Sequence, residues 1–276
     1  MTSKKKRKPA GPTFRTELAR RAKDLGVRDE DLDRALIIGQ IAGLLVQDPA
    51  LKGKLAHKGA AMLRLVDQSE RLSRDLDSGE IRGDHVDGRA VVRALSTESA
   101  RRVVLRVVTN RPSPNGISFL LECRALRGAA TMTIQLSINW SEPFILPPVK
   151  ASYVLPGGQP ITIPVMQAVE RAAEKVRAFL TRGEASDAYD LWWYETRVLT
   201  PTEHLKLLGL IRRKCTNTVV RIPGASDLLV RFDAMRAQAH EEWQSGHGLV
   251  IAGTKPDWAD VDRALLRFKG RTPRTL

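Results

Sequence analysis

Two aspartates stand two positions apart at the end of the segment Arg-Leu-Ser-Arg-Asp-Leu-Asp, residues 71–77. On a β-strand, alternate side chains point to the same face, so Ser73, Asp75 and Asp77 would share one face. Mg²⁺ prefers oxygen ligands and is usually held by one or two carboxylates together with substrate phosphates. The spacing therefore suggests a Mg²⁺ or Mn²⁺ site that activates an attacking hydroxyl against a triphosphate. The same spacing also occurs in loops and calcium sites.

A second candidate lies just upstream, where Lys58 and Gly59 precede Ala60 and an apolar helical stretch. A glycine turn that leads into a helix offers free backbone N–H groups, which can bind phosphate. Taken alone, this element is more simply explained as an ordinary turn with a solvated lysine.

A third candidate group lies further along the chain. Lys175 stands at the margin of an apolar helical stripe, from which its ammonium group could reach a cleft. Asp187 and Asp190 are three positions apart on a predicted helix that Ser186 would cap, so they share a face. Acidic residues in a first helical turn are favoured by the helix dipole even without a ligand.

The elements that must position these residues follow from apolar spacing. Residues 14–46 predict helices interrupted near Gly26, and residues 51–76 predict a strand, a turn, a helix and a second strand. A sheet is predicted from β-branched and period-two runs at residues 91–92, 103–108, 117–123 and 132–138.

The proline-rich stretch over residues 143–164 predicts an irregular connection. Helical spacing then resumes, with helices predicted at residues 165–179, 187–193, 202–215, 225–243 and 258–268. Trp192, Trp193 and Tyr194 could stack on bases, but their helical spacing beside Leu191 favours a place in the core. The expected fold is α+β, with a basic arm over 1–13, a mixed domain over 14–164 and a helical domain over 165–276.

Composition limits the classes of function. The chain has 276 residues, 45 Lys and Arg against 31 Asp and Glu, and a net charge of +14. The most apolar stretch, residues 35–46, is far shorter than the roughly 20 residues of a membrane-spanning helix, so we expect no membrane partner. Cys123 and Cys215 lack metal-ligand spacing, and a reducing cytoplasm suits them.

Positive charge favours a nucleic-acid partner. Basic clusters could follow a phosphate backbone, with an affinity that falls as salt rises. They lie at residues 4–8, 101–102, 212–214 and 263–274.

Taken together, the motifs resemble those of the AbiEii family of nucleotidyltransferase toxins, which includes the mycobacterial MenT toxins. The resemblance covers about residues 35–193, and its motifs lie in residues 58–63, 71–77, 174–178 and 187–191. It implies a polymerase-β-like nucleotidyltransferase domain over 14–164 with a helical domain after it. It also implies transfer of a nucleotide from an NTP with release of pyrophosphate, an antitoxin encoded nearby and, as in the MenT branch, the tRNA 3′ end as acceptor.

The resemblance also implies roles for individual residues. The turn at Lys58, Gly59 and Ala60 and the Ser73 hydroxyl would contact the phosphates, and Asp75 with Asp77 would ligate Mg²⁺. Lys175 would neutralise the triphosphate, and Asp187 or Asp190 would supply the later acidic group.

The sequence departs from the family pattern in three places: Ala60 replaces a second glycine, Ser186 replaces an arginine, and Gln135 and Ser137 stand where a third strand carboxylate is common. The last departure leaves open a catalytically inactive nucleic-acid-binding or antitoxin-interacting protein of the same fold. A nucleotidyltransferase that modifies a protein or a small molecule is a further alternative.

Overall fold

The computed structural model describes residues 14–81, 83, 86–126, 130–156, 158–216, 227–246 and 249–274. The basic arm expected over residues 1–13 lies outside these ranges. No helix in the described ranges is long and apolar enough to cross a membrane.

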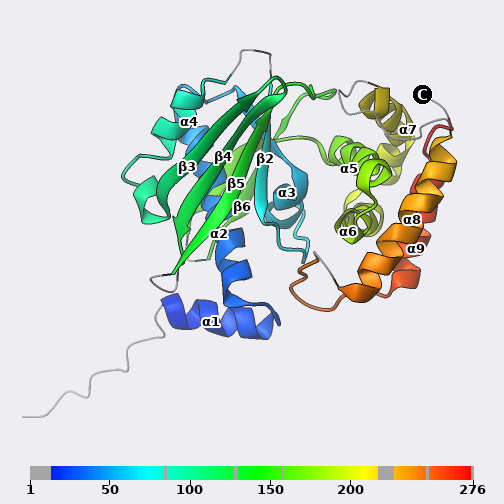
Figure 1. Cartoon of the computed structure of the whole chain (residues 1–276), viewed down its shortest axis with the longest axis horizontal. Helices are drawn as coiled ribbons and strands as arrows, with labels where there is room; N and C mark the ends of the chain where they lie inside the picture. Colours follow the sequence, from blue (N-terminus) through cyan, green and yellow to red (C-terminus); the bar gives the residue numbers. More distant parts are fainter. Residues whose placement is uncertain are drawn as a thin grey trace, which may run out of the picture.

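Helices and strands are mixed up to residue 165, and the elements that the structure describes after it are helices (Figure 1). The strands are β1 (Leu55–Lys58), β2 (Asp75–Glu80), β3 (Val104–Ser113), β4 (Gly116–Arg124), β5 (Thr131–Asn139), β6 (Val149–Val154) and β7 (Pro160–Val165). The helices are α1 (Phe14–Asp24), α2 (Asp29–Gln47), α3 (Gly59–Leu65), α4 (Gly88–Ala94), α5 (Ala168–Arg182), α6 (Ala185–Trp193), α7 (Pro201–Thr216), α8 (Leu228–Ser245) and α9 (Trp258–Gly270). A 3₁₀ turn, η1 (Ala100–Arg102), precedes β3, and a π-helical turn, η2 (Tyr194–Val198), follows α6.

Within the described residues, seven strands form one mixed sheet in the order β3-β4-β5-β2-β1-β7-β6. β2 lies near its centre, antiparallel to β1 and parallel to β5. The register places Asp75 opposite Gln135 and Asp77 opposite Ser137. The expected α+β class is therefore confirmed, and β2 presents its aspartates from a fixed central position.

Two clusters of buried apolar residues lie side by side. One joins the sheet to α2, which lies behind the sheet in Figure 1, and includes Ile38 and Phe119. The other joins α5 to α9 around Phe179 and Phe232, and Leu63 of α3 reaches into it from the first half of the chain. The division into domains at residue 164 stays a prediction.

Three predicted elements differ from the structure. Val91 and Val92 belong to α4 because their buried neighbours recur at helical spacing and the Asp87 carboxylate accepts a hydrogen bond from the Arg89 N–H. The connection at residues 143–164 contains the antiparallel pair β6–β7, in which Pro160 is the first residue of a strand, a position that needs no donor.

The third difference concerns the strand of the two aspartates, which begins at Asp75 and not at Arg71. The residues before it pair elsewhere, because Arg71 forms a bridge with Ile251 and the Leu72 N–H donates to the Val250 carbonyl. Ser73 therefore precedes the strand, and strand alternation does not place it beside the aspartates.

Candidate active site

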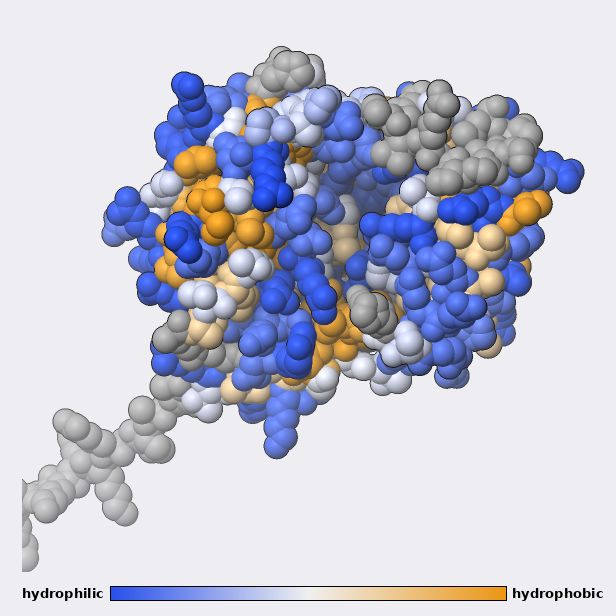
Figure 2. Space-filling model, viewed as in Figure 1, coloured by the Kyte–Doolittle hydropathy of each residue, from blue (hydrophilic) through white to orange (hydrophobic). Residues whose placement is uncertain are grey.

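A polar cavity of about 220 Å³ lies between the sheet and α5. It opens in the hollow between the two halves of the molecule, where hydrophilic residues form the rim (Figure 2). Its lining consists of Lys58, Gly59, Asp77, Ser78, Ser137, Asn139, Glu142, Arg171, Glu174, Lys175, Arg177, Ala178, Arg182 and Tyr194. Most of these side chains are charged, so the cavity suits a charged ligand.

One of the two β2 carboxylates lies on the sheet side of this cavity. Asp77 lines it, while Asp75 shares the strand face at a more exposed position. Burial raises the pKa of both carboxyls, and repulsion from Asp75 adds to the rise at Asp77. Neither carboxylate forms an ion pair with any residue the structure describes. Two close carboxylates without a cation are a favourable place for a positive ligand.

The β1–α3 turn lies in close contact with the Asp77 side chain. Gly59 has φ +74°, a left-handed conformation, and a Cβ built there would collide with the Asp77 carboxylate. Ala60 follows as a buried residue of α3. Only glycine fits at position 59 without displacing the carboxylate.

Lys58 is not solvated, contrary to the simpler interpretation of this turn. It is 7 % exposed, and its Nζ donates to Glu142 Oε2 at 2.8 Å and Glu174 Oε1 at 3.2 Å. Burial lowers its pKa, but the two glutamates outweigh burial and raise the pKa above its usual value. Lys58 is therefore a buried, permanently charged cation in the cavity.

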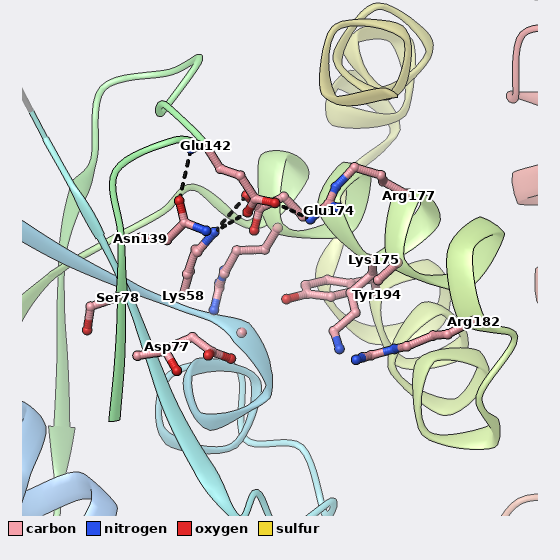
Figure 3. Close-up of a pocket in the computed structure, with 14 residues that line it drawn as sticks. Lys58, Asp77, Ser78, Asn139, Glu142, Glu174, Lys175, Arg177, Arg182 and Tyr194 are labelled. Carbon is pink, nitrogen blue, oxygen red and sulfur yellow. Dashed lines mark hydrogen bonds and ion pairs between the residues drawn. The ribbon is translucent and has the colours of Figure 1, made fainter. Parts of the chain in front are cut away.

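Lys175 and Arg182 extend from α5 toward Asp77 (Figure 3). The Nζ of Lys175 lies 2.9 Å from Asp187 Oδ1 and 2.8 Å from Asp190 Oδ2. Arg182 Nε lies 2.7 Å from Asp187 Oδ2. These cations face the unpaired carboxylate from the opposite wall.

The α6 aspartates hold those cations in place. Asp187 and Asp190 are both 0 % exposed, and Arg71 Nη1 adds a contact of 2.7 Å to Asp190 Oδ2. Lys175 and Arg182 outweigh burial and lower the pKa of Asp187 well below its usual value. The helix begins two residues earlier than expected, with Glu184 at the N-cap, so Ser186 lies inside the first turn and is not the cap.

Sequence reasoning missed an ion network above Lys58. Glu142 lies on the loop after β5 and contacts Arg177 Nη2 at 2.8 Å. Lys214 of α7 contacts Glu170 at 2.7 Å and Glu174 at 3.1 Å. No local pattern indicates these pairs, because the two partners of each pair lie 35 to 116 positions apart along the chain.

Some predicted residues are not brought into the cavity. The Ser73 hydroxyl donates to the Asp75 carbonyl at 2.9 Å, and Ser73 does not line the cavity wall. Trp192 and Trp193 are partly buried against the helical core. Tyr194 is 1 % exposed, as expected for a core residue, but it also lines the cavity.

Whether the site can hold a divalent cation depends on the side chains available as ligands. No group of three or more His, Cys, Asp or Glu side chains in the described ranges could hold a metal ion. Asp75 and Asp77 offer two carboxylates, and the β5 residues opposite them, Gln135 and Ser137, are neutral. Two carboxylates that lack an ion-pair partner fit a cation that completes its coordination with substrate phosphates and water.

Comparison with known proteins places this arrangement in context. The family model described as "Nucleotidyl transferase AbiEii toxin, Type IV TA system" matches residues 43–266. Among solved structures, the chain is similar to the nucleotidyltransferase toxin MenT4 from Mycobacterium tuberculosis H37Rv, with a TM-score of 0.52 and 18 % identity over 90 % of this chain and 98 % of that one.

A second similar structure is JHP933 from Helicobacter pylori, with a TM-score of 0.47 and 14 % identity over 88 % of this chain and 90 % of that one. At such identities the likeness to MenT4 shows a common fold. No curated protein matches the chain.

Proposed function

Because the chain belongs to the AbiEii family of nucleotidyltransferase toxins from type IV toxin–antitoxin systems, we propose that it transfers a nucleotide from an NTP to the 3′ end of tRNA. Loss of a free tRNA 3′ end would block translation. The observation that carries the proposal is the cavity in which the unpaired Asp77 carboxylate faces Lys175 and Arg182 of α5.

Catalysis would depend on positioning and charge neutralisation, as in other phosphoryl transfers. The acceptor hydroxyl attacks the α-phosphorus, and the bond to the β-phosphate breaks to release pyrophosphate. Lys58 and Lys175, both with a raised pKa, keep their positive charge and neutralise the triphosphate. Gly59 lets the chain pass close to Asp77 without displacing its carboxylate.

Asp75 and Asp77 would hold Mg²⁺ or Mn²⁺. When bound, such an ion neutralises phosphate charge and lowers the pKa of the attacking hydroxyl. Since β5 supplies no third carboxylate, we propose that a single ion is held by this pair.

The acceptor is proposed to be RNA because the chain carries a net charge of +14. Exposed Arg212 and Arg213 on α7 and Arg74 beside Asp75 could contact its backbone. We further propose that the protein acts in the cytoplasm, where NTPs and tRNA are available, and that an antitoxin encoded nearby counteracts it. The two free, buried cysteines agree with a reducing compartment.

The test is label transfer. The wild type and the Asp75→Ala variant are incubated with each labelled NTP, Mg²⁺ and total tRNA. The control is Asp260→Ala, because Asp260 is a half-buried aspartate of α9 that does not line the cavity. We expect label on tRNA with the wild type and the control only.

Equal labelling by the Asp75→Ala variant would contradict the proposed site. Label that migrates with protein would identify a protein acceptor. RNA binding without transfer from any NTP would favour an inactive binding protein, the alternative that the neutral Ser137 opposite Asp77 suggests.

A further inference from the structure

The Tyr194 side chain is deeply buried, and its hydroxyl group points into the cavity. The residue is 1 % exposed, and Figure 3 shows its hydroxyl group pointing from the helical side into the cavity next to Lys175. Asp187, Asp190 and Tyr194 follow one another at spacings of three and four, so they share the helix face toward α5. The hydroxyl thus joins the group of side chains around Lys175.

The Tyr194 hydroxyl has no hydrogen-bond partner among the residues that the structure describes. The hydroxyl oxygen is not among the fully buried polar atoms that lack a partner, so it is open to the cavity. A hydroxyl that opens into a cavity and bonds no neighbouring side chain is available to donate to a ligand bound there. Burial raises the pKa of this phenol above its usual value, so the hydroxyl keeps its proton and can donate.

The ring of Tyr194 is held from the side by Arg171. This arginine is 3 % exposed, lines the same cavity, and its Cζ lies 5.9 Å from the ring centroid. Its Nη2 contacts Asp67 at 3.0 and 2.8 Å, whereas Nε and Nη1 have no partner in the described part of the chain. The positive charge of Arg171 makes this wall favourable for an anion.

We propose that the Tyr194 hydroxyl donates a hydrogen bond to the pyrophosphate part of the bound NTP, with Arg171 as the residue that positions the ring. The proposal rests on the function proposed above. Because the attacked α-phosphate must lie beside Asp75 and Asp77 on β2, the opposite wall faces the β- and γ-phosphates. The π-helical turn that starts at Tyr194, closed by the Leu199 N–H to the Tyr194 carbonyl at 2.9 Å, fixes the backbone from which the phenol projects.

The test uses Tyr194→Phe in the full chain, a change that removes the hydroxyl and keeps the ring. Calorimetric titration with Mg²⁺ measures the affinity for an α,β-methylene triphosphate of each base and for the matching monophosphate. Tyr189→Phe is the matched control, because Tyr189 is buried on α6, directly before the turn of Tyr194, and does not line the cavity. Thermal denaturation verifies that each variant is folded.

We expect Tyr194→Phe to bind the triphosphate about tenfold more weakly, the loss typical of a hydrogen bond to a charged group. Affinity for the monophosphate and all affinities of Tyr189→Phe should stay at the wild-type level. The inference is overturned if Tyr194→Phe and the wild type bind the triphosphate with equal affinity, or if the variant loses affinity equally for the triphosphate and the monophosphate. In either case, label transfer by the wild type would leave the proposed function standing. A wild type that binds no triphosphate overturns both.

Discussion

The pair of aspartates on β2 and the pair on α6 have opposite electrostatic states. Asp75 and Asp77 on β2 form no ion pair among the described residues, and burial raises their pKa. On α6, Asp187 and Asp190 are fully buried against Lys175, with Arg71 and Arg182 completing the contacts. The sheet pair is costly to keep ionised without a ligand, whereas the helix pair already has its cations.

The difference separates two functions of the same residue type. A carboxylate whose charge is unpaired in the folded chain is available to bind a cation. A carboxylate whose charge is satisfied internally fixes the position of a lysine or arginine. We therefore assign ligand binding to the β2 pair and positioning to the α6 pair, and each prediction below tests that assignment.

The largest effect is expected for Asp77→Asn. Losing this carboxylate should reduce label transfer about a thousandfold or more, a loss at the upper end of what one electrostatic group contributes in an active site. Thermal stability should stay the same or rise, because the pKa of Asp77 lies above its usual 3.8 and ionisation therefore destabilises the folded chain. Transfer assays and thermal denaturation of one preparation measure both quantities, and a large drop in melting temperature would argue that Asp77 is structural.

Asp187→Asn should show the reverse balance. Removing one partner of a buried ion pair leaves Lys175 and Arg182 under-compensated and should lower the free energy of unfolding by roughly 3–5 kcal/mol. Urea denaturation measures the loss. Asp233→Asn is the control, since its exposed pair with Lys269 at 2.6 Å should contribute at most about 1 kcal/mol. Equal stability losses in the two variants would remove the distinction between the aspartate pairs.

A smaller effect tests the contact between the turn and the sheet pair. Gly59→Ala and Gly53→Ala both place a side chain at positive φ, which costs roughly 1–2 kcal/mol. A Cβ at Gly53 meets nothing within 4 Å, but at Gly59 it meets the Asp77 carboxylate. We expect both variants to lose similar stability and only Gly59→Ala to lose transfer as well. Full transfer by Gly59→Ala would show that the position of Asp77 is not critical.

The smallest effect is expected from lowering the pH, which should change the two pairs of aspartates at different pH values. The raised pKa of Asp77 means that it gains a proton at a pH above its usual 3.8, so cation binding should weaken there first. The lowered pKa of Asp187 means that its stabilising contribution is complete above 3.8 and is lost only as pH falls below that value. Nucleotide binding and circular dichroism are followed from pH 7 to pH 4. As the pH falls, we expect the protein to stop binding nucleotide before it unfolds. Simultaneous loss would indicate that the two pairs titrate together.

Much of the cavity could be predicted from the sequence because its residues lie in short local motifs. Asp77, Gly59 and Lys175 were found from spacing and from the order of the motifs, and their elements form in the predicted order. The β-branched and period-two runs predict β3, β4 and β5, and the pattern over residues 51–76 predicts β1 and β2. The run at residues 91–92 is helical instead, and prolines hide the strand pattern of β6 and β7.

The rest depends on contacts that no local pattern records. The Glu142 carboxylate reaches Lys58 across 84 positions, and Arg171 reaches Asp67 across 104. Tyr194 was predicted as core, which it is, but its place on the cavity depends on how α6 packs against α5. Its spacing from Asp187 and Asp190 was the one available signal, and it has meaning only once those aspartates are known to face Lys175.

The most direct measurement of the central claim is the affinity for Mn²⁺, followed by electron paramagnetic resonance in the presence of a non-transferable NTP analogue. The assignment of the two pairs predicts that the wild type and a folded Asp187→Asn protein bind the ion, while Asp77→Asn binds it at least about tenfold more weakly. Equal affinity of Asp77→Asn and wild type, or a loss confined to Asp187→Asn, would contradict it.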